Sequence, residues 1–159
     1  MEILLVRHGA ASWDTKTDIE RTLTDLGRVE INAASAWLTA SEWQPDELWV
    51  SPYKRAAESA EILNQQWQLR PRLKSSLTPD TPLSELEAML ATFRGDRLML
   101  VSHNPLLSNA INHWHGGEAQ SYWGMQTASM AMLDADVFSQ GCASLRWLRH
   151  YPNYDHNGR

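Results

Sequence analysis

The chain has one cysteine, Cys142, among its 159 residues. A single thiol cannot form an internal disulfide, and it cannot supply the set of thiolates that a structural zinc site needs. No apolar run approaches the ~18 residues of a membrane-spanning helix. The chain also opens without the charged segment and apolar stretch of a secretory signal. These absences predict a cytoplasmic protein that does not enter a membrane.

Positive charge is scarce as well. Lysine and arginine number 14 against 19 aspartates and glutamates, which gives a formal net charge of −5. This balance argues against a general affinity for nucleic acid or for an anionic membrane. An anionic ligand would therefore need a local cluster of arginines that acts against the overall field.

No internal repeat, low-complexity tract or domain linker interrupts the chain. Its length suits one domain that buries a substantial core, so we expect a single domain over residues 1–159. The polar tail from Tyr151 to Arg159 is expected to be loose, as chain ends often are.

Short apolar runs alternate with helical patterns through the first two thirds of the chain. Strands are expected at 2–7, 47–51, 70–75, 97–102, 128–134 and 143–150. Helices are expected to start at Thr24, Ser51-Pro52, Thr81-Pro82 and Asn104-Pro105, the last of them ending at Gly116-Gly117. This alternation predicts a three-layer α/β sandwich with a mostly parallel central sheet flanked by helices. The last two strands have no helix between them, so a hairpin there makes the sheet mixed.

Two of the expected strands end in a histidine. The first strand runs into Arg7 and His8, and the fourth runs into His103. Arg55 lies one turn into the helix that follows the second strand. Because the carboxyl ends of parallel strands meet at one edge of a sheet, we expect these four side chains to converge there. Helix N-termini at the same edge also favour an anion.

Two guanidiniums and two imidazoles suit the transfer of a phosphoryl group. Arginine presents a planar fork of donors that matches two phosphate oxygens. A neutral imidazole can attack phosphorus and hold the phosphoryl group covalently, which divides the transfer into two steps. The neighbouring cations are expected to lower the pKa of the imidazole and so keep a lone pair available near neutral pH. Charge on the transferring oxygens would be met by Arg7, Arg55 and the second histidine.

The segment Leu5-Val6-Arg7-His8-Gly9 resembles the signature of the histidine phosphatase superfamily, whose fold is phosphoglycerate mutase-like. The segments Ser51-Pro52-x-x-Arg55-Ala56 and Val101-Ser102-His103-Asn104-Pro105 follow in the family's order, and these motifs span most of the chain. The resemblance implies that His8 is the nucleophile that becomes phosphorylated and that His103 donates to the transferring group. It implies no metal and no organic cofactor. The phosphate-binding residues that it implies are Arg7, Gly9, Arg21 and Arg55.

The compact length and the segments Arg21-Thr22-Leu23-Thr24 and Leu77-Thr78-Pro79 look similar to the SixA-like phosphohistidine phosphatases. Larger members of the superfamily have an insertion after the second helix that caps the site, and the short span between Trp67 and Leu98 holds little more than a loop and one helix. The resemblance implies a partner protein that bears phosphohistidine, such as a phosphotransfer or phosphocarrier domain. A phosphoramidate nitrogen leaves more readily than an alkoxide, and an uncapped site admits a whole protein domain.

The loop after Arg-His-Gly departs from that pattern. SixA-like members commonly have an acidic residue directly after these three, whereas this chain has Ala10-Ala11. Asp14 and Asp18 are nearby candidates for the same loop, and the difference bears on the substrate more than on the chemistry. Trp13 could contact a partner protein or fold back on the helix at Asp25, and the sequence favours neither.

Two other functions fit the same motifs. One is a phosphatase of the same chemistry that acts on small phosphomonoesters. The other is a non-catalytic module that keeps the pocket and binds phosphate or a phosphoprotein.

Several polar side chains have a plainer interpretation. Arg21 could be a solvated loop arginine or part of a surface ion pair. Glu85 and Glu87 belong to a helix rich in glutamate, where a solvated face is the favoured role. His113 and His115 are two residues apart on a helix and point to different faces, which argues against shared ligation of a metal.

Overall fold

The computed structural model describes residues 1–116 and 122–155. Within these residues, six strands form one sheet in the order β3-β2-β4-β1-β5-β6. The strands are β1 (Glu2–Arg7), β2 (Glu47–Val50), β3 (Arg72–Leu73), β4 (Arg97–Ser102), β5 (Met130–Asp134) and β6 (Ser144–Arg149). The first four strands pair in parallel, whereas β5 is antiparallel to both β1 and β6. The predicted mixed, mostly parallel sheet is confirmed.

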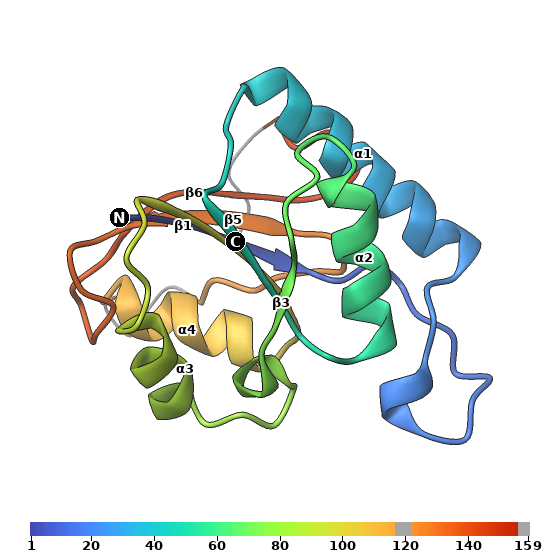
Figure 1. Ribbon diagram of the computed structural model, residues 1–159, viewed down its shortest axis with the longest axis horizontal. Helices are drawn as coiled ribbons and strands as arrows, with labels where there is room; N and C mark the ends of the chain where they lie inside the picture. Colours follow the sequence, from blue (N-terminus) through green and yellow to red (C-terminus); the bar gives the residue numbers. More distant parts are fainter. Residues whose placement is uncertain (117–121, 156–159) are drawn as a thin grey trace.

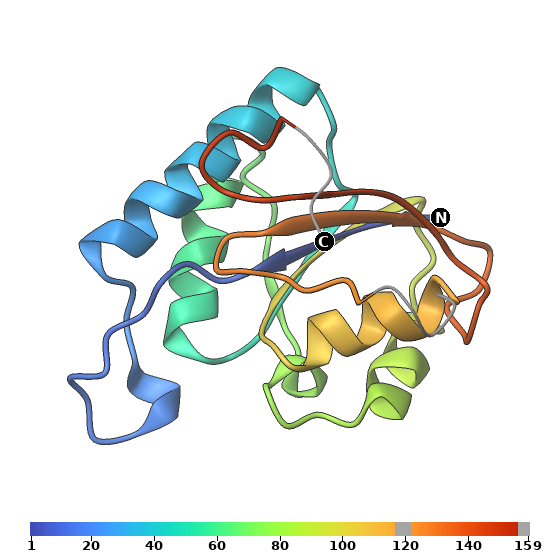
Figure 2. The same ribbon diagram turned by 180° about the vertical axis from the view of Figure 1, so that it is seen from behind.

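Helices cover both faces of this sheet. They are α1 (Asp25–Ser41), α2 (Lys54–Asn64), α3 (Leu83–Leu90) and α4 (Leu106–Trp114), with short 3-10 helices η1 (Asp18–Glu20) and η2 (Ser75–Leu77). Figure 1 shows α1 and α2 on one side of the sheet and α3 and α4 on the other, and Figure 2 shows the same layers from behind. The predicted three-layer sandwich is confirmed.

The core lies on both faces of the central strands. In β1, Ile3 and Leu5 pack toward α3 and α4, while Leu4 and Val6 pack toward α1 and α2, and all four side chains are fully buried. Burial of one such side chain is worth roughly 1.5–3 kcal/mol. Because parallel strands are covered on both faces, they are apolar without alternation, which explains the continuous run in this segment.

The predicted helix starts are right at Thr24 and wrong at Ser51. The Thr24 side chain accepts a hydrogen bond from the Gly27 N–H at 3.0 Å and caps α1. In contrast, α2 begins at Lys54, with Tyr53 as its N-cap residue. Ser51 therefore lies two residues before the N-cap position, and its hydroxyl lies 2.7 Å from a ring nitrogen of His103.

One residue of the tail that was expected to be loose, Tyr154, is packed against the core. The Tyr154 side chain is only 1% exposed, and its hydroxyl donates to the carbonyl of Ala128 at 2.8 Å. Residues 156–159 of the tail lie outside the described residues, as does Gly117 at the predicted end of the fourth helix. In the described ranges, every helix is too short or too polar to cross a membrane.

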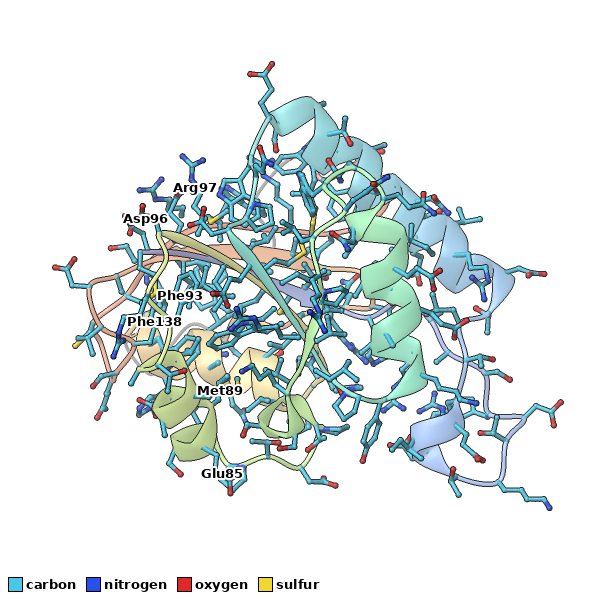
Figure 3. All side chains as sticks on the ribbon, in the orientation of Figure 1. Glu85, Met89, Phe93, Asp96, Arg97 and Phe138 are labelled. Atoms are coloured by element: carbon cyan, nitrogen blue, oxygen red, sulfur yellow. The ribbon has the colours of Figure 1, made fainter. Side chains whose placement is uncertain are left out.

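The connections after β1 and β4 leave these neighbouring strands in opposite directions. The chain passes from β1 through α1 to β2, and from β4 through α4 to β5. Such a switch point leaves a crevice at the carboxyl ends of the two strands. Register pairs Arg7 with Ser102, so the residues that follow both strands lie side by side. Asp96 and Arg97, at the amino end of β4, mark the far end of the sheet (Figure 3).

The turn after β1 is packed against the start of α1. A Cβ atom added to Gly9 would stand 2.6 Å from the carbonyl oxygen of Gly27, and one added to Gly27 would overlap the backbone of Ala10. Gly27 therefore does more than weaken the first turn of a helix, because it allows the backbone of the turn to approach α1 closely.

Candidate active site

His8 directly follows β1, and its side chain is almost fully buried. Its Nδ1 lies 2.7 Å from the carbonyl oxygen of Gly9. Because a carbonyl oxygen can only accept, Nδ1 carries the hydrogen, and Nε2 of the neutral ring keeps its lone pair. The Arg55 Nε–H lies 3.3 Å from that Nε2. The backbone thus selects the tautomer whose free nitrogen faces a guanidinium.

Both site histidines stay neutral at pH 7. Burial is the main cause that lowers the pKa of His8 to about 3; the hydrogen bond to Gly9 opposes this shift, and the charges of Arg55 and Arg7 add to it. Burial also lowers the pKa of His103 to about 2, with smaller contributions from His8 and Arg55. The sequence prediction relied on the cations alone, whereas the structure assigns the larger effect to burial.

His103 follows β4, and its ring centroid lies 5.0 Å from that of His8. Its Nε2 lies 2.7 Å from the Ser51 hydroxyl, and this hydroxyl already accepts a hydrogen bond from the Tyr53 N–H at 3.3 Å. The Ser51 hydroxyl can donate to Nε2 while it accepts from Tyr53, and in that tautomer the ring hydrogen lies on Nδ1. Among the described residues, this Nδ1 has no hydrogen-bond partner, so in that tautomer it is a donor available for a ligand oxygen.

The two predicted arginines border the same cavity as His8. This cavity has a volume of about 370 Å³ and also includes Asn104 and Thr127 in its wall. Arg55 is the second residue of α2 and is 4% exposed. The Arg7 Nη1 donates to the carbonyl of Met125 at 2.9 Å, which holds its guanidinium beside the cavity. The structure therefore brings together all four side chains that were predicted to converge.

Asp18 is the acidic residue that the loop contributes to this cluster. Its carboxylate accepts from Arg55 Nη2 at 3.2 Å and from Arg21 Nη1 at 3.1 Å, and its carbonyl accepts from Arg55 Nη1 at 2.7 Å. Burial alone would raise the pKa of Asp18, but the hydrogen bonds from Arg21 and Arg55 outweigh it and lower the pKa. Asp14, the other candidate, and Asp18 are both exposed to solvent, so the ion pairs with Arg21 and Arg55 are what connect Asp18 to the cluster.

Arg21 borders the cavity, but most of its hydrogen-bond donors bind residues of the loop. Its Nε and Nη2 donate to the carbonyls of Ser12 and Ala11 at 2.9 and 3.3 Å, and its Nη1 donates to Asp18. Three of the five N–H groups of the guanidinium are thereby used, and two remain for a phosphate oxygen.

Gly9, which was predicted to bind phosphate, makes its described hydrogen bonds to the protein itself. Its N–H donates to the Ser59 hydroxyl at 3.1 Å, and its carbonyl accepts from His8. Gly9 is absent from the described wall of the cavity. Its contacts indicate that it orients the imidazole, and its contact with phosphate stays a prediction.

Comparison with known proteins identifies this arrangement. Residues 3–78, which carry Arg7, His8 and Arg55, match the sequence model of the histidine phosphatase superfamily (branch 1). This match and the similarity to SixA support the histidine phosphatase superfamily as the family of this chain. Its fold agrees with that of the solved SixA structure, and the similarity to SixA supports a phosphatase.

The alignments with known proteins extend over nearly the whole chain. The phosphohistidine phosphatase SixA of Escherichia coli (strain K12) is 25% identical over 146 residues, which are 89% of each chain. A structure of the protein histidine phosphatase SixA complexed with tungstate aligns with a TM-score of 0.82 and 22% identity, over 94% of this chain and 97% of that one. The α-ribazole phosphatase of Shigella flexneri aligns with a TM-score of 0.75 and 18% identity, over 100% and 99% of the two chains.

Glu30 is a site residue that the sequence prediction missed. It lies on α1 with only 6% of its surface exposed. One carboxylate oxygen accepts from the Ala10 N–H at 2.8 Å, and the other accepts from the Thr127 hydroxyl at 2.9 Å. Ala10 and Thr127 both border the cavity. Glu30 therefore connects two walls of the cavity from behind, and no local pattern marks it, because a glutamate in an amphipathic helix is usually solvated.

We expect Glu30→Ala to lower both stability and kcat. The substitution leaves the Ala10 N–H without its partner, which costs about 1–3 kcal/mol when such a group is buried. Glu30→Gln should retain most of the stability and most of kcat, because its amide oxygen can accept from the Ala10 N–H and its amide N–H₂ can donate to the Thr127 hydroxyl. Urea unfolding and initial rates on one substrate would check this, and equal losses in the two variants would contradict it.

Stability should fall as the pH drops below 6.5. The pKa values of His8 and His103 are lowered from 6.5 to about 3 and about 2 in the folded protein. Below pH 6.5 the unfolded chain therefore binds protons that the folded chain excludes. Each histidine then lowers the free energy of unfolding by about 1.4 kcal/mol per pH unit. Urea unfolding between pH 6 and pH 4 should show a shallower loss in His103→Asn than in the wild type. Identical slopes would mean that His103 is protonated in the folded state.

The remaining sequence candidates lie outside the site. Glu85 is exposed on α3 and points away from the sheet (Figure 3), in agreement with the solvated face that was predicted. The His115 Nδ1 accepts from the Leu145 N–H at 3.1 Å, and its ring packs edge-on against Trp123. Within residues 1–116 and 122–155, no three His, Cys, Asp or Glu side chains are grouped as metal ligands would be.

Proposed function

We propose that this phosphatase hydrolyses phosphohistidine on proteins through a covalent phosphohistidine on His8. The observation that carries the proposal is the tautomer of His8, whose Nδ1–H is held by Gly9 and whose Nε2 faces Arg55. A nucleophile with a pKa of about 3 needs no general base at neutral pH. Tungstate, the ligand named for the similar SixA structure, is an oxyanion of the same shape as phosphate.

The reaction proceeds in two balanced steps. His8 Nε2 attacks phosphorus, the P–N bond of the substrate breaks, and the departing imidazole takes up one proton. Water then attacks the phosphorus of phospho-His8, which releases inorganic phosphate and one proton and restores the neutral ring. Nδ1 of His8 keeps its hydrogen throughout. Arg7, Arg55 and the Nδ1–H of His103 meet the negative charge on the oxygens in both transition states.

The open surroundings of the cavity support a protein substrate. The segment between α2 and β4 forms β3 at the sheet edge and α3 on the opposite face from α2, and it contributes no residue to the cavity wall. The mouth is instead bordered by the loop that carries Ala11, Trp13 and Arg21. The relatives named phosphohistidine phosphatase SixA support the same substrate.

Small phosphomonoesters are the second candidate substrates. The similarity to the α-ribazole phosphatase of Shigella flexneri favours this alternative, because that fold is shared over the whole chain. A non-catalytic module that binds phosphate is the third candidate, and it differs from the other two in forming no phosphoenzyme.

A comparison of substrates tests the proposal. The kcat/KM should be highest for a histidine-containing phosphotransfer domain phosphorylated with phosphoramidate, and lower for p-nitrophenyl phosphate and for sugar or nucleotide monophosphates. A clear preference for one of the small esters would assign the enzyme to the second candidate. Binding of vanadate without turnover of any phosphodonor would assign it to the third.

We expect chelation to leave the activity intact. The phosphoryl oxygens are matched by the guanidiniums of Arg7 and Arg55, whose charges would also repel a divalent cation from the cavity. Initial rates with and without EDTA, at pH 7 and constant ionic strength, measure this directly. Inhibition by EDTA that Mg²⁺ or Zn²⁺ reverses would reject the metal-independent mechanism.

A further inference from the structure

Trp13 is an exposed aromatic side chain at the mouth of the phosphatase cavity. It is 81% exposed, the largest exposed fraction among the large apolar side chains described. It also borders the same cavity as Arg7 and His8. Whatever carries a phosphoryl group to His8 must therefore pass beside this ring.

The ring of Trp13 is exposed and yet held in place. The guanidinium carbon of Arg21 lies 3.4 Å from the ring centroid, so one face of the indole is covered by a stacked cation. Arg21 is fixed in turn by the carbonyls of Ser12 and Ala11 and by the Asp18 carboxylate. Trp13 does not fold back on α1, and its second face is presented to solvent in one orientation.

The loop that carries Trp13 is braced at its base. The Ser12 N–H donates to the Thr22 carbonyl at 2.8 Å, and Ala11 forms an antiparallel bridge with Leu23. Figure 2 shows the loop standing out beyond the sheet. An aromatic contact that is fixed before binding loses little freedom when a partner covers it.

We propose that the free face of Trp13 is the docking contact for the protein that carries the phosphohistidine, an inference that rests on the proposed function. The occupant is an uncharged or apolar patch on the substrate protein beside its phosphorylated side chain. A small ligand inside the cavity would leave most of an 81%-exposed ring uncovered, whereas a protein surface can cover it. Tryptophan is among the commonest anchors in protein interfaces, and charged side chains such as Asp14 and Lys16 in the same loop, both exposed, suit a surrounding polar rim.

Two substrates with the same scissile bond separate docking from chemistry. A phosphorylated phosphotransfer domain offers a P–N bond together with a protein surface, and phosphoramidate offers the P–N bond alone. In Trp13→Ala we expect kcat/KM for the domain to fall by about tenfold or more relative to kcat/KM for phosphoramidate, mainly through KM. Trp13→Phe should recover most of the loss, because a ring remains. Val137→Ala, which shortens a 57%-exposed side chain in the connection after β5, should leave the ratio unchanged.

The outcomes distinguish the docking contact from the function on which it rests. Equal losses on both substrates would show that Trp13 acts through Arg21 and the loop, and would overturn the docking contact. A Trp13→Ala enzyme that matches the wild type on both substrates would overturn it too. A wild type that cleaves phosphoramidate but no phosphorylated domain would overturn the proposed function and this inference with it.

Discussion

The His8→Ala enzyme is expected to hydrolyse no phosphodonor and to carry no phosphate label. Nε2 of His8 is the nitrogen whose lone pair the Gly9 carbonyl leaves free, and it lies 3.3 Å from Arg55 Nε. Removal of an essential nucleophile typically costs several orders of magnitude in kcat. Label from a ³²P phosphodonor, with the reaction stopped at alkaline pH because phosphohistidine is destroyed by acid, measures the intermediate directly.

His113→Ala is the matched control for that experiment. His113 is a half-buried histidine in the last turn of α4 and lies outside the described wall of the cavity. The His113→Ala enzyme should carry the phosphate label like the wild type and should turn over the substrate at a similar rate. If the label instead persisted in His8→Ala, the nucleophile would be a different residue, and His103 would be the next to examine.

Arg55→Ala has the second largest expected effect. Arg55 sits at the start of α2, contacts the nucleophile directly, and is held by the backbone carbonyl and the carboxylate of Asp18. Loss of one preorganised donor to the charge of a transition state costs about 10²–10³ in kcat, or about 3–4 kcal/mol. Arg55→Lys should recover only part of this, because an ammonium keeps the charge without the two-pronged geometry.

Initial rates at saturating substrate measure the effect, and Arg94→Ala is the control. Arg94 is an exposed arginine after α3 whose guanidinium donates only to nearby carbonyls. Its removal should change kcat by less than about twofold, because exposed contacts of this kind contribute little. An Arg55→Ala enzyme with an unchanged rate would remove this residue from the phosphoryl site.

The parts of the fold that could be predicted are those decided by short stretches of sequence. β1 and β4 are recognisable because strands covered on both faces are apolar throughout. The convergence of His8, Arg55 and His103 follows from the rule that parallel strands end at one edge. The strand order could not be predicted, because it depends on which way each connection crosses the sheet.

The parts that were missed depend on partners distant in the sequence. Ser51 resembles a helix cap, but its hydroxyl is needed by His103, 52 residues away. Glu30 resembles a solvated helix residue, but it binds Ala10 and Thr127 from two other segments. Local propensity cannot reveal such contacts, because each partner reaches the site only after the layers have packed.

The backbone contact between Gly9 and Gly27 determines how accurately the imidazole is aimed. A methyl group at either position would push the turn after β1 away from α1, and the Gly9 carbonyl that orients His8 would move with it. The arginines around the cavity would then keep their positions, but Nε2 of His8 would no longer point at phosphorus. The direction of the attacking nitrogen therefore depends on the absence of a side chain at two positions behind it.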